Sequence, residues 1–116
     1  MRMTVGERRF AITLAGNAAA CAFAALLPLT LDMSELNRNE KHAELREPLT
    51  ADASRPGTIR TGDLMLYGTS TLVLFYVTFN SSYSYTRLGR VDETADLPQA
   101  LGRGAVRVVF SQDSIP

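Results

Sequence analysis

The sequence predicts a mainly β fold, a small closed eight-stranded antiparallel barrel with two short helices capping its ends. The first observation is a run of three strands at residues 64–67, 72–79 and 83–91, which are rich in the β-branched and aromatic side chains that suit a sheet. The second is the element order, because eight strands with only two helices lack the β-α-β alternation of a parallel α/β sheet. Closing the sheet removes its exposed edges, and the two helices can cover the open ends.

The first third of the chain reads as two strands, a helix and a third strand. Alternating apolar side chains predict strands at residues 1–5, 8–15 and 29–33. Asn17 is a good helix N-cap and Pro28 stops the helix, which runs to about Leu27. Because this helix carries no charge, we expect it to be largely covered, with Cys21 as an inert buried thiol.

The middle of the chain is less regular, and the end returns to regular elements. Residues 41–46 have only Ala43 and Leu45 for a core, which predicts an edge strand or a solvated hairpin arm. Residues 47–61 read as a long surface connection with a turn at Pro56-Gly57. A short helix at 95–101 and a last strand at 105–110 complete the pattern. The expected organisation is therefore one domain over residues 1–110 and a C-terminal tail over 111–116.

Composition limits the partners and the compartment. The 116 residues include 12 basic and 12 acidic side chains, so no basic excess is available for phosphates and no nucleic-acid partner is expected. A single cysteine excludes an internal disulfide and fits a reducing, cytoplasmic location. The uncharged run 10–31 approaches the length of a membrane span or signal segment. Its breaks at Gly16-Asn17 and Pro28 favour three separate elements and no membrane partner, although the signal segment stays an open alternative.

Aromatic side chains gather on the central strands and predict a ligand-binding groove. Such a groove would take a small apolar ligand or a peptide side chain, with tyrosine hydroxyls orienting it. Strand alternation would place Tyr83, Tyr85 and Arg87 on one face. The expected groove residues are Met65, Tyr67, Tyr83, Tyr85 and Arg87. The competing interpretations are core filling for Met65 and pairing with a surface acid for Arg87.

Other chemistry finds little support in the sequence. His42 has no second His or Cys at metal-ligand spacing, so no metal site is expected. No serine lies in a nucleophile-elbow pattern and no glycine-rich loop suits a phosphate, so no cofactor is expected. Asp63 follows Gly62 before an apolar strand and is interpreted as a residue that shapes the turn.

Several local motifs carry a family resemblance over nearly the whole chain. They are Leu27-Pro28-Leu29-Thr30-Leu31, Pro56-Gly57, the run from Gly62 to Gly68, Ser82-Tyr83-Ser84-Tyr85 and Arg87-Leu88-Gly89. Together they resemble a prokaryotic family of cyclophilin-like fold proteins. The resemblance implies a small cytoplasmic barrel, and the family's occurrence beside flavodoxin-type domains implies a possible redox or flavodoxin-type protein partner.

The resemblance transfers fold better than activity. True cyclophilins isomerise the bond before proline with an arginine in a Phe-His-Arg stretch, and the matching strand here, residues 29–33, has none. We therefore expect a binding domain with no or weak catalysis, whose partner is a small molecule or a proline-containing peptide. The alternative is a peptidyl-prolyl isomerase with a displaced arginine, for which Arg60 and Arg87 are the candidates. Neither lies at a matching motif position, so the catalytic residues stay unassigned.

Overall fold

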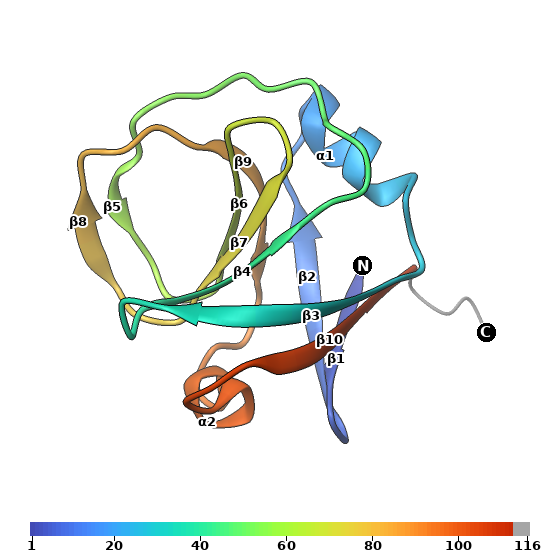
Figure 1. Ribbon diagram of the computed structural model, residues 1–116, viewed down its shortest axis with the longest axis vertical. Helices are drawn as coiled ribbons and strands as arrows, with labels where there is room; N and C mark the ends of the chain where they lie inside the picture. The colour runs from blue at the N-terminus through green and yellow to red at the C-terminus, as the bar shows by residue number, and fades with distance from the viewer. Residues whose placement is uncertain (113–116) are drawn as a thin grey trace.

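The computed structural model describes residues 1–112, which fold into a mainly antiparallel β structure with two short helices (Figure 1). The strands are β1 (Arg2–Val5), β2 (Arg8–Leu14), β3 (Leu29–Leu36), β4 (Glu40–Glu44), β5 (Gly57–Ile59), β6 (Asp63–Tyr67), β7 (Thr71–Phe75), β8 (Phe79–Ser81), β9 (Thr86–Val91) and β10 (Val106–Ser111). The helices are α1 (Ala18–Ala24) and α2 (Leu97–Leu101).

Eight of these strands close into a barrel, as the sequence predicts. The order around the barrel is β1-β10-β3-β4-β7-β6-β9-β2, and β2 pairs with β1 to complete the ring. Every pairing is antiparallel, so short turns are enough to join several neighbours in sequence. β4 lies between β3 and β7, and the expectation of an edge strand or solvated arm at residues 41–46 is therefore wrong.

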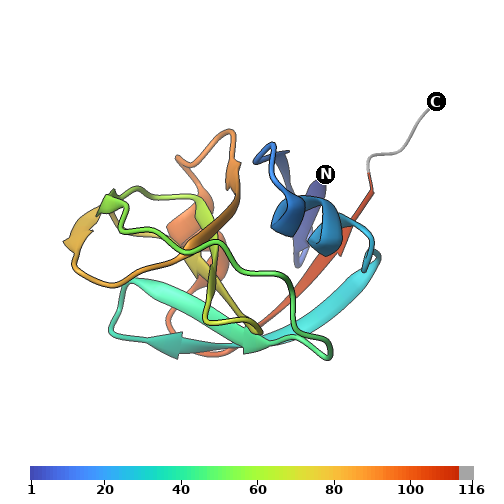
Figure 2. The same ribbon diagram turned by 90° about the horizontal axis from the view of Figure 1, so that it is seen from above.

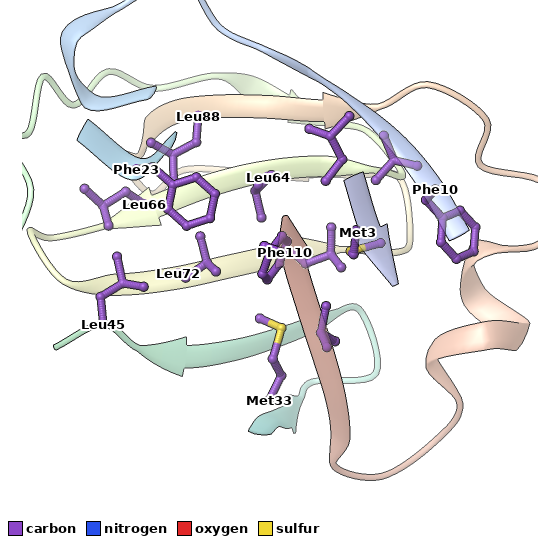
Figure 3. Packing of buried hydrophobic residues seen from close by; sticks show 14 of the residues in the cluster. Met3, Phe10, Phe23, Met33, Leu45, Leu64, Leu66, Leu72, Leu88 and Phe110 are labelled. Atoms are coloured by element: carbon purple, nitrogen blue, oxygen red, sulfur yellow. The ribbon is translucent and has the colours of Figure 1, made fainter. Parts of the chain in front are cut away.

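The barrel interior is filled by apolar side chains from all parts of the chain (Figure 3). Phe23 of α1 is fully buried and meets Phe110 of β10 edge to face, with ring centroids 5.6 Å apart. Asn17 caps α1 as expected, because its side-chain oxygen accepts from the Ala20 amide at 2.8 Å. From α2, Leu97 and Leu101 add to the same core. Figure 1 shows the two helices on opposite sides of the barrel.

Helix α1 is only half covered, contrary to the expectation from its uncharged sequence. Ala19, Ala20 and Phe23 are buried, whereas Cys21 is exposed. A helix of two turns that lies on the end of a barrel can bury only one face, and alanine costs little when it is left in water. The thiol is therefore on the outer face of α1 and not in the core.

A second, smaller sheet lies outside the barrel and was not predicted. The expected strand at residues 72–79 divides in two, because β7 ends at Phe75 and β8 begins at Phe79. β8 then pairs with β5, which occupies part of the expected surface connection at 47–61. Figures 1 and 2 both show this pair at one side of the molecule, away from β1 and the chain termini.

The side sheet covers part of the outer barrel wall and forms a second core. Five buried residues make up this core: Ile59, Met65, Val73, Phe75 and Tyr85. Phe79 packs against them, with its ring 5.7 Å from that of Phe75. β6 and β7 are thus buried on both faces, which explains why their sequences are apolar without alternation.

The expected strand at residues 83–91 is shorter than predicted. β9 begins at Thr86, and before it Tyr85 makes only an isolated antiparallel bridge with Ser54. A register shift at Leu64/Met65 interrupts the pairing of β6 with β9. Tyr83 lies before the Tyr85 bridge and outside any strand, so strand alternation does not govern it: Tyr83 is 63% exposed, whereas Tyr85 is 7% exposed.

Lys41 is the least expected member of the interior. Its side chain is fully buried, and its ammonium donates to Glu35 at 2.9 Å and to the carbonyls of Gly102 and Gly104 at 2.9 and 2.6 Å. These acceptors come from β3 and from the segment after α2. A buried charge is tolerated when it is paired and hydrogen-bonded, so Lys41 ties β4 to the α2 end of the barrel.

Two further expectations concern the ends of the chain. The last strand extends to Ser111, and residues 113–116 of the expected tail lie outside the described residues. In the described part of the chain, neither helix is long and apolar enough to cross a membrane.

A close backbone approach between β9 and β2 generates a stability prediction. A Cβ placed on Gly89 would lie 2.7 Å from the Thr13 carbonyl oxygen and 3.3 Å from Leu14 Cα, so β2 would have to shift. We expect Gly89→Ala to lower the free energy of unfolding by roughly 1–3 kcal/mol in urea denaturation. Gly16→Ala is the matched control, because nothing lies within 4 Å of a Cβ there. Equal stability of the two variants would contradict the close approach.

Candidate functional site

The candidate site is a hollow of about 280 Å³ on the outer wall of the barrel, which we call the tyrosine hollow. β4, β7 and β6 contribute to it, together with the segments after β3 and before β9. Its lining residues are Leu36, Asn37, Glu40, His42, Tyr67, Thr71, Val73, Tyr83 and Tyr85. The volume is just below the usual range for ligand pockets, and it suits a small molecule or one side chain of a peptide.

Three tyrosine rings form one wall of the hollow. Tyr67 lies between the other two, with its centroid 6.3 Å from Tyr83 at an interplanar angle of 87° and 5.8 Å from Tyr85 at 57°. Tyr67 and Tyr83 are 48% and 63% exposed, whereas Tyr85 is buried beneath them. All three belong to the groove expected from the sequence, and the structure brings them together.

Tyr85 is held in place from both sides. Its backbone amide and carbonyl each pair with Ser54 at 3.0 Å, and its ring meets Phe75 edge to face at 5.4 Å. Burial raises the pKa of the Tyr85 hydroxyl, and the charge of Glu40 raises it further. The phenol therefore stays protonated at neutral pH and can donate a hydrogen bond.

Glu40 is the acidic group of the hollow, and its position follows from strand alternation. Glu40 and His42 lie opposite Phe75 and Val73 in the register of β4 and β7, so they share the outer face with those two residues. Glu40 is 8% exposed. Within residues 1–112 its carboxyl has no hydrogen-bond donor and no cation at salt-bridge distance. Burial and the charge of Glu35 both raise its pKa.

The nearby Glu35, unlike Glu40, has a full set of hydrogen-bond donors. It accepts from the Lys41 ammonium, from the Tyr76 hydroxyl at 2.6 Å and from the Arg38 amide at 2.8 Å. Burial acts to raise the Glu35 pKa, but these hydrogen bonds outweigh it and lower the pKa. The pKa of Tyr76 rises to about 12, through burial and then its bond to Glu35. Lys41 neutralises Glu35, and Glu40 is left without a cation.

Two of the five expected groove residues lie outside the tyrosine hollow. Met65 is buried in the second core with Tyr85 and does not line the hollow. The Arg87 guanidinium is half exposed and lies 3.4 Å from the carboxylate of Asp63, which is a buried partner and not a surface acid. Asp63 also accepts from the Arg60 amide at 2.9 Å, as its interpretation as a turn residue implies.

Six lining residues of the hollow were not expected from the sequence: Leu36, Asn37, Glu40, His42, Thr71 and Val73. The signal for Glu40 and His42 was present, because they alternate with Lys41 and Ala43 on a strand. It was overlooked because a strand with so many charges reads as a solvated edge. Leu36 ends β3 and Asn37 begins the turn that follows, and only the folded chain brings these residues next to the tyrosines.

The chemistry available in the hollow is recognition by aromatic faces, hydroxyls, an amide and a carboxyl. Thr71 donates its hydroxyl to the exposed Glu44, so it is already occupied. Within residues 1–112 there is no group of three or more His, Cys, Asp or Glu side chains that could hold a metal ion.

The raised pKa of Glu40 generates a prediction for stability against pH. Because the folded state disfavours the carboxylate, Glu40 costs stability as pH rises through the ordinary glutamate pKa and the raised folded one. We expect Glu40→Gln to raise the free energy of unfolding by at most about 1 kcal/mol at pH 7–8, because the carboxylate is largely withdrawn from water, and to change little at pH 3.5. Urea denaturation across this range measures the difference. Glu47→Gln, at an exposed loop residue, is the control, and an equal pH response of the two variants would contradict the burial of an unpaired carboxyl.

The comparison with known protein families agrees with the barrel and its motifs. The model of the Cyclophilin-like family matches residues 3–111, which includes every barrel strand and both helices apart from the first residue of β1. No curated protein and no solved structure gives a significant match to the chain. The match spans nearly the whole length, so the chain belongs to the cyclophilin-like family.

Proposed function

We propose that this protein is a binding module whose tyrosine hollow takes a small ligand or a single side chain of a peptide. The observation that carries the proposal is the placement of exposed apolar surface. Four large hydrophobic side chains stay exposed in residues 1–112, and three of them, Leu36, Tyr67 and Tyr83, line the hollow. Exposed rings that converge on a hollow are typical of a recognition site.

The geometry favours binding over isomerisation. Catalysis of the bond before proline needs a donor placed to favour the twisted amide. None of the arginines in residues 1–112 lines the tyrosine hollow. Arg87 pairs with Asp63, and Arg60 lines a separate polar hollow with Thr58 and Thr78. A displaced arginine therefore has no support at this site.

A redox or flavodoxin-type partner would need an apolar docking surface away from the hollow. Within the described residues, Val77 is the one large exposed hydrophobic side chain outside the lining of the hollow. A single side chain does not make a docking patch. The observations thus support a small ligand or peptide more than a protein partner of this kind.

The test is an NMR titration of labelled protein with short peptides that contain a residue before proline. We expect shifts at Tyr67, Tyr83 and Tyr85, with the cis–trans exchange of the peptide staying at its uncatalysed tens to hundreds of seconds. Tyr83→Ala should weaken binding several-fold. Val77→Ala, which removes another exposed hydrophobic side chain, should not. Faster exchange would overturn the non-catalytic assignment, and shifts confined to other surfaces would overturn the site.

A further inference from the structure

The strongest unexplained feature of the hollow is the Glu40 carboxyl. A nearly buried carboxylate is costly unless a cation or several donors compensate it. Glu40 has neither within residues 1–112, and the next residue, Lys41, points to the opposite face of β4, where Glu35 and two carbonyls hold it. Lys41 therefore cannot neutralise Glu40, and within the described part of the chain the Glu40 carboxyl stays unpaired at the hollow.

The surroundings of Glu40 favour positive charge in the hollow. The faces of aromatic rings carry negative potential, and a cation over a Tyr face is stabilised more strongly where water is excluded. Three tyrosines line the hollow beside Glu40. Among the described lining residues, only His42 can carry a positive charge, and no lysine or arginine is present. A ligand carboxylate would meet this same acid and would be repelled.

We propose that the tyrosine hollow recognises an alkylammonium group, with the Glu40 carboxylate as its counter-ion and the rings of Tyr67, Tyr83 and Tyr85 around its carbon atoms. This inference rests on the proposed binding function and names its ligand class. The aromatic wall provides contact for the methylene or methyl groups, and Glu40 accepts a hydrogen bond from, or lies beside, the cationic nitrogen. Such a group occurs both in small free amines and in lysine side chains.

Three four-carbon probes of similar size and different charge test the inference: n-butylammonium, n-butanol and butyrate. Their binding is followed by the ring signals of tyrosine in ¹³C-labelled full-length protein. Four tyrosines are present, and Tyr76 lies outside the hollow, so it is the internal reference. We expect n-butylammonium to shift Tyr67, Tyr83 and Tyr85 and to bind about tenfold more tightly than n-butanol, with butyrate weakest.

The matched variants separate charge from shape. Glu40→Gln keeps the size of the side chain. We expect it to weaken the binding of n-butylammonium about tenfold and to leave the affinity for n-butanol unchanged. Glu47→Gln removes a glutamate on an exposed loop and should change neither. If n-butylammonium and n-butanol bind equally, or if Glu40→Gln leaves the amine affinity unchanged, ammonium recognition is overturned while the binding function stands. If no probe moves the three tyrosines, both are overturned.

A further arm distinguishes the two sources of the ammonium. An acetylated, amidated Gly-Lys-Gly peptide is compared with n-butylammonium. Tighter binding of the peptide assigns the hollow to lysine side chains of a polypeptide, and equal or weaker binding assigns it to free amines. Either result supports recognition of the ammonium group, and failure of both to bind contradicts it.

Discussion

Strand β4 is hydrogen-bonded on both sides, to β3 and β7, and this double pairing fixes the direction of each of its side chains. Because alternate side chains point to opposite faces, Lys41 and Ala43 lie on the face of Leu74 and Leu72, inside the barrel. Glu40 lies on the outer face. A slip of one residue would exchange these faces and would put an acid into the core. The pairing that closes the barrel therefore also places the acid of the candidate site.

The outer wall becomes a site because a second layer covers only part of it. The β5–β8 sheet and the chain before β9 bury Val73, Phe75 and Met65. Tyr85 ends this layer, bridged to Ser54, and Tyr67 stands next to it at the end of β6. At the edge of this second layer, the aromatic rings pack against the second core on one face and are open to the hollow on the other. That boundary is the tyrosine hollow.

Two acids on neighbouring strands differ because of what each can reach. Glu35 lies on β3 within reach of Lys41 and Tyr76, and its pKa is lowered. Glu40 is adjacent to Lys41 in sequence, but the two side chains lie on opposite faces of β4. The pKa of Glu40 is raised by burial and by the charge of Glu35. The buried Lys41 pairs with Glu35 and the carbonyls near α2 at the end of the barrel. Among the described residues, the carboxyl of Glu40 is therefore left without a cation at the hollow.

The barrel, both helices and the tyrosine cluster could be predicted from the sequence, because β-branched runs, an asparagine cap and proline or glycine stops act locally. Residues 72–75 show this, since a run that is apolar throughout fits a strand buried on two sides. The side sheet could not be predicted, because β5 has only three residues and pairs with a strand about twenty residues later. Lys41 and Glu40 were misread as solvated for a related reason. Lys41 is held by the carbonyls of Gly102 and Gly104, and Glu40 lines the hollow with Tyr85, and these partners are distant in sequence.

The most direct test of this account is the titration of Glu40 itself, followed by NMR of the side-chain carboxyl carbon in ¹³C-glutamate-labelled protein. A buried carboxyl without a cation should titrate above the ordinary glutamate pKa, whereas Glu35 should titrate below it. The opposite order, or a Glu40 pKa at or below the ordinary value, would mean that the carboxyl is solvated or already paired. The account of the hollow as a site that awaits a cation would then be wrong.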